Sequence, residues 1–324
     1  MTQPPKFAPR PLQKPGLFRR TPPAIFPPLL GTLALGLGWR EGAGLFGLPG
    51  GLAEAFLGAA VLLWAFMHLA YLAKLARRPG VLAEDLAILP GRAGLGAAVM
   101  SDYSAAMAIA PYAPDLARAL LVLGLALHLL LMLAVIRALR AGPEAGRDVT
   151  PAWHLVFVGP ILGAVAALVL GWDGLARVIF VLTLPMALFI WGTSLRQLVR
   201  RIPPAPLRPL LAIHLAPASL FGLVAIGLGW TEIAFIFAAL ASVILLALLV
   251  SGRWVLESGF SPLWGALTFP LAAFARLMLS LPGWATLGGV ALVLATLVIL
   301  PILVRVLQDW ARGRLAIKTN AAEA

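Results

Sequence analysis

The sequence contains no cysteine and little charge. The lack of cysteine excludes disulfides and thiolate metal sites. Charged residues make up 12% of the 324 residues, whereas hydrophobic residues make up 61%. A soluble protein could not cover that much apolar surface with so few polar side chains. The composition therefore indicates an integral membrane protein.

Motifs of catalysis and metal binding are also missing. The loops lack Ser-x-x-Lys, His-Glu-x-x-His and phosphate-loop patterns, and the 13 acidic residues form no group with metal-ligand spacing. We therefore expect no enzyme, no cofactor and no metal. A membrane enzyme or a haem protein is the alternative from a different class. Bis-histidine haem needs two His at one depth, which only His68 and His214 share, and interhelical hydrogen bonds are the plainer interpretation of the His residues.

What the chain does contain is long apolar stretches, each about 20 residues, the length that spans a bilayer as a helix. They cover residues 23–39, 51–73, 93–111, 114–136, 154–171, 174–195, 209–229, 231–250, 261–281 and 284–306. Lipid offers the backbone no hydrogen-bond partner, so each stretch should be helical. The short alternating segments of an outer-membrane barrel do not occur. The sequence therefore predicts an all-α integral membrane protein with ten transmembrane helices.

The basic residues orient these helices. The 25 Lys and Arg residues lie in the N-terminal segment and in every second gap thereafter, except for Arg40, Arg118, Arg177 and Arg276. The positive-inside rule then places both termini in the cytoplasm. The formal net charge of +12 follows from this topology and from anionic lipid, so no nucleic-acid partner is expected. The preference for Arg over Lys is typical of a GC-rich bacterial genome, and we expect a bacterial inner (plasma) membrane.

Three parts follow from these patterns. Residues 1–22 are basic and rich in proline and lack the apolar core and cleavage site of a signal peptide, so we expect a retained, disordered cytoplasmic tail. Residues 23–311 form the transmembrane pore domain. Residues 312–324 form a cytoplasmic C-terminal tail.

A proline followed by a Gly-Trp pair recurs in four of the five odd-numbered stretches. The prolines are Pro28, Pro160, Pro217 and Pro270, and the tryptophans are Trp39, Trp172, Trp230 and Trp284. Proline kinks a helix and frees a carbonyl group, which lipid does not tolerate. We therefore expect five helical hairpins, with the odd-numbered helices as an inner ring around a central pore. The broken helices would point their positive ends at a small anion.

The ninth stretch carries a recognisable motif. Its Trp264-Gly-Ala-Leu-Thr268-Phe269-Pro270 resembles the ninth helix of the tellurite-resistance/dicarboxylate transporter family, which includes the bacterial TehA proteins and the plant slow-type anion channels. The region from His154 to Pro160 and the run Leu215-Ala216-Pro217-Ala218 are also similar. The resemblance covers the chain after residue 22 and implies a homotrimer whose subunits each have a pore. It implies that Phe269 is the gate and that the four prolines are the kinks of the pore helices.

The expected function is conduction of small inorganic or organic anions. Thr268, Asp102 and Arg276 are the candidate polar or charged residues of the pore. A carboxylate in the middle of a membrane must be paired, protonated or hydrated. We hypothesise an ion pair between Asp102 and Arg276; alternatively, Arg276 attracts anions at the outer pore.

Asp102 also motivates a second transport function. If it couples protons, the protein would be a proton-linked carrier or exporter of a C4-dicarboxylate, sulfite or tellurite. A membrane protein whose plugged pore never opens is a further alternative.

Overall fold

The computed structural model describes residues 16–324, and that part of the chain consists of helices and loops without a strand. Most of the tail expected at residues 1–22 lies outside the described residues. Within the remainder, the carbonyl oxygen of Arg19 accepts a hydrogen bond from the backbone N–H of Ala324 at 3.1 Å. The two ends of the described chain therefore meet at one end of the molecule, which we call the terminal face.

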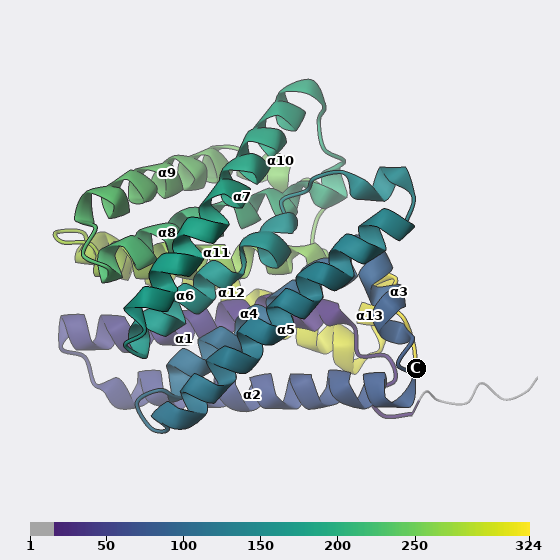
Figure 1. The fold of residues 1–324 in the computed structure, drawn as a ribbon, viewed down its shortest axis with the longest axis horizontal. Coiled ribbons are helices and arrows are strands. Elements are labelled where there is room, and N and C mark those ends of the chain that lie inside the picture. The colour runs from purple at the N-terminus through teal and green to yellow at the C-terminus, as the bar shows by residue number, and fades with distance from the viewer. Residues whose placement is uncertain (1–15) are drawn as a thin grey trace, which may run out of the picture.

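Long helical segments follow one another as antiparallel hairpins (Figure 1). The first members are α1 (Phe26–Phe46), α4 (Leu89–Ile109), η3–α6 (His154–Val158 and Pro160–Val169), η4–α8 (Ala205–His214 and Leu215–Gly227) and η5–α11 (Pro262–Trp264 and Gly265–Ser280). The second members are α2 (Gly50–Arg77), α5 (Pro114–Ala141), α7 (Asp173–Arg200), α9 (Thr231–Val250) and α12 (Ala285–Ala311). Short elements join them: η1 (Pro23–Ile25), α3 (Val81–Ala87), η2 (Glu144–Arg147), α10 (Gly252–Val255) and α13 (Arg314–Thr319).

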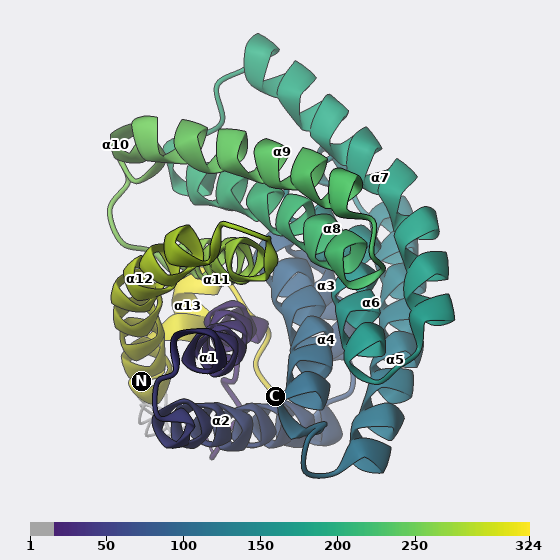
Figure 2. The ribbon, with the colours of Figure 1, turned by 90° about the vertical axis from the view of Figure 1, so that its left-hand side faces the viewer.

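The first members of the hairpins form a closed ring. Going round it, α1 contacts α4, α4 contacts α6, α6 contacts α8, α8 contacts α11, and α11 contacts α1. Each second member packs on the outside of its own partner (Figure 2). This arrangement follows the expected division into odd-numbered inner helices and even-numbered outer helices.

Burial separates the two layers. Of the seven helices that are long and apolar enough to cross a membrane, η4–α8 and η5–α11 have 78% and 72% of their apolar windows buried in the protein, against 22% to 33% for α2, α5, α7, α9 and α12. The outer helices thus present their apolar side chains to lipid. The chain is an all-α membrane protein. It stays a prediction that the membrane is also crossed by α1, α4 and η3–α6, which are shorter or carry more small or polar residues.

The recurring prolines mark changes of helix type rather than kinks in the middle of helices. Pro28, Pro160 and Pro217 lie in the first turns of α1, α6 and α8, and Pro270 alone of the four lies inside its helix. A 3-10 or π-helical turn precedes each of these α-helices. The first N–H groups of a helix have no partner within it, so proline there costs no hydrogen bond. The expectation of a mid-helix kink therefore fits Pro270 only.

α1 and α11 approach each other closely at Gly31. A Cβ atom at Gly31 would lie 2.4 Å from the Cβ atom of Thr268, so a side chain there would displace α11. The Thr268 hydroxyl lies 2.7 Å from the carbonyl oxygen of Gly265 and 3.0 Å from that of Pro27. Thr268 therefore ties the two helices together, and the ring closes at this contact.

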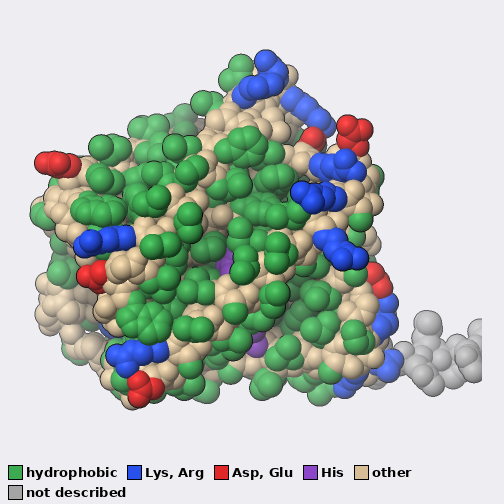
Figure 3. Space-filling view, in the orientation of Figure 1, with side chains coloured by type: hydrophobic (Ala, Val, Ile, Leu, Met, Phe, Trp, Pro, Cys, Tyr) green, Lys and Arg blue, Asp and Glu red, His purple; other side chains and the backbone are tan. Residues whose placement is uncertain are grey.

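The terminal face contains a fully buried ion pair. The Lys74 ammonium lies 2.8 Å from Oδ2 of Asp85, and the Tyr71 hydroxyl donates to the same oxygen at 3.0 Å. Oδ1 of Asp85 accepts a hydrogen bond from the backbone N–H of Ala322 at 3.0 Å. The short helix α3, which carries Asp85, thus holds the C-terminal segment against α2. Figure 3 shows Lys and Arg gathered along this edge of the molecule, next to a broad apolar surface.

Candidate functional site

A narrow cavity lies inside the ring among the first turns of the inner helices. Its lining comes from η1–α1, α4, η3, η4–α8 and η5–α11: Ala24, Pro27, Leu30, Pro90, Ala93, Ala97, Leu155, Leu210, Ile213, Ala216, Pro262, Leu263, Gly265, Ala266, Phe269 and Pro270. The cavity volume is about 40 Å³, which holds only a few water molecules. None of the lining side chains is charged. The cavity is therefore an apolar constriction between all the inner segments.

The electrostatic character of this cavity comes from the backbone. Three inner segments begin beside it, at Ala24, Pro90 and Pro262, and the first N–H groups of a helix carry no intrahelical partner. Each helix N-terminus bears a partial positive charge of about half an elementary charge. Several such ends around one small, apolar space favour an anion over a cation without placing a fixed charge in the wall.

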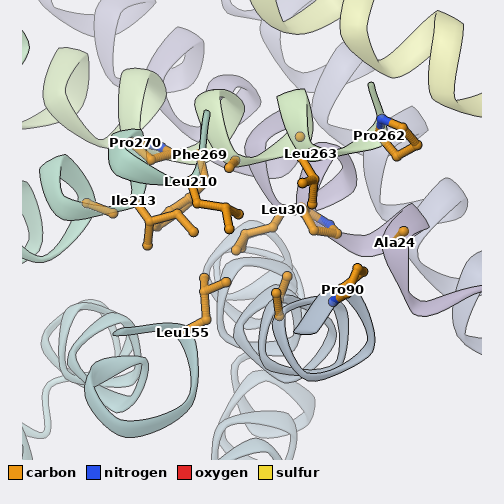
Figure 4. A pocket seen from close by; sticks show the side chains of 16 residues that line it. Ala24, Leu30, Pro90, Leu155, Leu210, Ile213, Pro262, Leu263, Phe269 and Pro270 are labelled. Carbon is orange, nitrogen blue, oxygen red and sulfur yellow. The ribbon is translucent and has the colours of Figure 1, made fainter. Parts of the chain in front are cut away.

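Phe269 lies at the deepest part of the cavity wall contributed by α11. The α11 residues in the lining are Gly265, Ala266, Phe269 and Pro270, so Phe269 and Pro270 lie furthest from the start of that helix. The Phe269 side chain is 3% exposed. Figure 4 shows it beside Pro270 and Leu210. The large aromatic ring of Phe269 thus forms part of the apolar wall of the cavity.

Thr268 does not line this cavity. Its hydroxyl is fully engaged with the two carbonyl groups of α11 and of the start of α1, and its side chain is buried. The structure therefore places Thr268 in the contact between two ring helices, next to Phe269 in sequence but on another face of α11.

The hypothesis of an Asp102–Arg276 ion pair is wrong. Asp102 on α4 accepts a hydrogen bond from Nε1 of Trp64 at 3.0 Å, and its Oδ1 lies 3.2 Å from Nε2 of His68. Arg276 on α11 instead binds Glu41 on α1, with its Nη2 2.6 Å from Oε1. The physical reason is the order of the ring: α1 lies between α4 and α11, so their facing side chains meet α1 or the outer helices first.

Asp102 on α4 faces His68 on the outer helix α2. Nδ1 of His68 lies 2.9 Å from the carbonyl oxygen of Trp64, which can only accept, so Nδ1 carries a hydrogen. Nε2 is then the ring nitrogen that faces the Asp102 oxygen. Together with the Trp64 hydrogen bond, this contact gives the buried carboxyl group of Asp102 two polar partners and joins α4 to the outer helix α2.

The charge of Arg276 is also balanced. Its side chain is 4% exposed, and the Glu41 carboxylate binds both Nε and Nη2. The neighbouring Arg40 pairs instead with Glu54 on α2 and donates to the carbonyl oxygens of Met107 and Ala108. Consecutive residues of a helix point about 100° apart, which sends Arg40 and Glu41 to different partners. The adjacent opposite charges of Arg40 and Glu41 near the end of the first apolar stretch are the sequence signal for these pairs.

The four His residues all make hydrogen bonds between helices or within one helix. Nε2 of His154 lies 3.0 Å from Nδ1 of His214, and Nε2 of His214 lies 2.7 Å from the Ser194 hydroxyl. His68 and His214, the pair that haem would have required, have separate partners. The plainer interpretation of the His residues is therefore confirmed. Across residues 16–324, no group of three His, Asp or Glu side chains could hold a metal ion.

His128 makes the interhelical hydrogen bonds expected of the His residues, and its partners lie in the wall of the ring. It contacts the π-helical turn η3, where Nε2 donates to the carbonyl oxygen of Val156 at 2.9 Å, and its Nδ1 lies 3.1 Å from the Tyr103 hydroxyl. A π-helical turn in the wall of a ring leaves the backbone hydrogen bonds irregular. His128 provides the partner from the outer helix α5. Only the spatial proximity of α5 and η3 reveals this role, so the sequence carried no signal for it.

The comparisons with known proteins agree with this geometry. The SLAC1 family model, described as a voltage-dependent anion channel, matches residues 20–307, which covers all the ring helices and nearly all of α12. No curated protein matches the chain.

Proposed function

The chain belongs to the SLAC1 family of voltage-dependent anion channels, and from that premise we propose that it conducts small inorganic or organic anions through the axis of its helix ring. The family supports an anion channel or transporter in a membrane. The observation that carries the finer proposal is the cavity that all the inner segments share, with helix N-termini around it and no charged side chain in its lining. Such a wall attracts an anion weakly, which suits passage rather than tight binding.

We assign the gate of this pore to Phe269. Its ring is buried at the narrow cavity, and the adjacent Pro270 removes a backbone hydrogen bond inside α11. Removal of that bond lets α11 bend at the level of the gate at a smaller cost than an uninterrupted helix would allow. Opening then requires only that the ring of Phe269 leave the axis, while the start of α11 stays tied to α1 by Thr268.

The topology and assembly of the channel are part of the same proposal. Both ends of the described chain, residues 16–324, lie on the terminal face, where basic residues gather, and by the positive-inside rule we assign that face to the cytoplasm. We place the protein in a bacterial inner membrane as a homotrimer, with one pore in each subunit. The support for association is the wide apolar surface of the outer helices, for which lipid and a neighbouring subunit compete.

Current measurements on Phe269→Ala test the proposed gate. The wild type and the variant are recorded in planar bilayers with chloride or nitrate, and Phe269→Ala should raise the anion-selective current at least about tenfold, because the constriction widens by a whole ring. Phe274→Ala is the matched control, since Phe274 is equally buried on the same helix but does not line the cavity. Folded protein that stays silent in all three forms would contradict the channel proposal.

A proton-linked carrier of a dicarboxylate, sulfite or tellurite is the second candidate. The observation that favours it is the contact between Asp102 and His68, two side chains of the kinds that exchange protons in carriers. Against it, Asp102 binds the outer helix α2 and does not line the cavity. Uptake driven by a pH gradient into vesicles, lost in Asp102→Asn, would support the carrier. Unchanged anion flux in this variant would exclude Asp102 from transport.

A further inference from the structure

A second, larger cavity lies outside the ring, on the terminal face between α3, the start of α4 and the end of α5. We call it the headgroup pocket; its volume is about 450 Å³. Small side chains leave the space open, namely Ala83 and Ala87 of α3 and Ala134 and Ala138 of α5. Arg92 and Arg137 are the two charged residues of its lining, and no acidic residue contributes.

The arginines are free to bind a ligand. Arg92 uses Nη1 to hold the carbonyl oxygens of Leu86 and Ala87 at 3.1 and 3.0 Å, which fixes its guanidinium group and leaves its other N–H groups without a protein acceptor in residues 16–324. Arg137 has no hydrogen-bond or ion-pair partner among these residues and is exposed. Arg side chains bind phosphate through paired N–H groups better than through charge alone.

The nearby acidic residues do not neutralise the pocket. Asp85 on α3 is fully buried and bound to Lys74, and Glu84 pairs with Arg78. Glu144 and Asp148 lie in the loop beyond α5 and are not part of the lining. The pocket therefore has a net positive charge from two arginines.

The pocket continues into a surface that faces lipid. Leu130 and Leu133 of α5 are 61% and 57% exposed, and with Arg137 they follow a spacing of three and four residues, which places all three on one side of the helix. Going from Leu130 to Arg137, that side changes from apolar to basic over about 10 Å. An apolar stripe that ends in a basic residue complements a phospholipid, which has apolar acyl chains and an anionic head.

We propose that the headgroup pocket binds the phosphate group of an anionic phospholipid, with Arg92 and Arg137 as its ligands and the acyl chains along α5. Basic pockets between membrane helices on the cytoplasmic side are suited to such headgroups. The bound lipid bridges α3, α4 and α5. The site is separate from the ring cavity, so its occupancy does not depend on whether the ring conducts.

Native mass spectrometry of the full chain in detergent tests this proposal. Purified protein is titrated with phosphatidylglycerol or with phosphatidylcholine, and the ratio of the two bound lipids is measured. Arg137→Gln should lower the preference for phosphatidylglycerol about tenfold, and Arg92→Gln should do the same. Arg92 also caps α3, so Arg137→Gln, which breaks no protein contact, decides the outcome if Arg92→Gln does not fold.

Arg140→Gln is the matched control, because Arg140 is exposed on the last turn of the same helix but does not line the pocket. It should keep the preference of the wild type. An equal loss in Arg137→Gln and Arg140→Gln would show diffuse attraction to the basic face and overturn the proposal. Displacement of the lipid by glycerol phosphate at the same concentration would assign the pocket to a soluble phosphate instead. The lipid preference and its displacement by glycerol phosphate are measured without any current. They therefore test the pocket even if the Phe269→Ala currents contradict the proposed channel function.

Discussion

Asp85→Asn tests the buried ion pair on the terminal face. Lys74 and Asp85 are both 0% exposed, and the carboxylate accepts from the Lys74 ammonium, the Tyr71 hydroxyl and the Ala322 N–H. The amide of Asn can still accept from Ala322, but the Lys74 charge loses its counter-charge. Removal of one partner of a buried pair costs about 3–5 kcal/mol. We therefore expect the apparent Tm to fall on the order of 10 °C.

The assay is thermal unfolding in detergent, followed by the fluorescence of the 10 Trp residues. Lys74→Met together with Asp85→Asn removes both charges and should recover most of the loss, because a neutral pair carries no desolvation cost. Glu84→Gln is the control on the same short helix: its carboxylate is exposed and paired with Arg78, so the change should be at most about 0.5 kcal/mol.

The same variant should also release the C-terminal segment. Without the Asp85 carboxylate, the backbone of Ala322 loses a charge-assisted hydrogen bond, and carboxypeptidase should remove residues 320–324 faster than in the wild type. An Asp85→Asn protein that unfolds within about 2 °C of the wild type and resists the protease equally would refute this account of the pair.

Three further outcomes follow from the ring. Gly31→Leu should abolish folding, because even a Cβ atom at Gly31 would lie 2.4 Å from Thr268; the yield of monodisperse protein in size-exclusion chromatography measures it. Glu41→Gln should leave Arg276 buried without a counter-charge, lowering the apparent Tm and, if the axis conducts, raising anion over cation selectivity in reversal-potential measurements. Asp102→Asn removes the carboxylate beside His68 but keeps the Trp64 contact, so the variant should fold and its anion current should be within about twofold of the wild type. Loss of the current in a folded variant would contradict the position of Asp102 outside the cavity.

The layered architecture was readable from the sequence because two physical rules act locally. The recurring proline before a Gly-Trp pair marks four of the five ring helices, although Pro28, Pro160 and Pro217 lie in first turns and only Pro270 lies inside its helix. The alternation of basic gaps marks one end of the bundle, where Arg92 and Arg137 lie. Both patterns reflect how each helix interacts with the membrane. They can therefore be read along the chain without knowing which helices are neighbours.

The partners of polar side chains were not readable in the same way. Asp102 and Arg276 both lie on inner helices, which makes them plausible partners from the sequence, yet the order of the ring puts α1 between them. The partner of Asp102 is His68 on an outer helix, and that of Arg276 is Glu41. A hydropathy pattern gives the depth of a residue but not its angle around the axis, so it cannot select among partners at similar depth.

Closure of the ring has a consequence for biosynthesis. The contact between Thr268 and Pro27 joins residues 241 positions apart, so the last hairpin must reach the first after nearly the whole chain has left the ribosome. Until then α1 has one flank without its neighbour, and such distant contacts form late because chain entropy must be lost first. A nascent or truncated chain without the last hairpin therefore has an open ring and no enclosed axis.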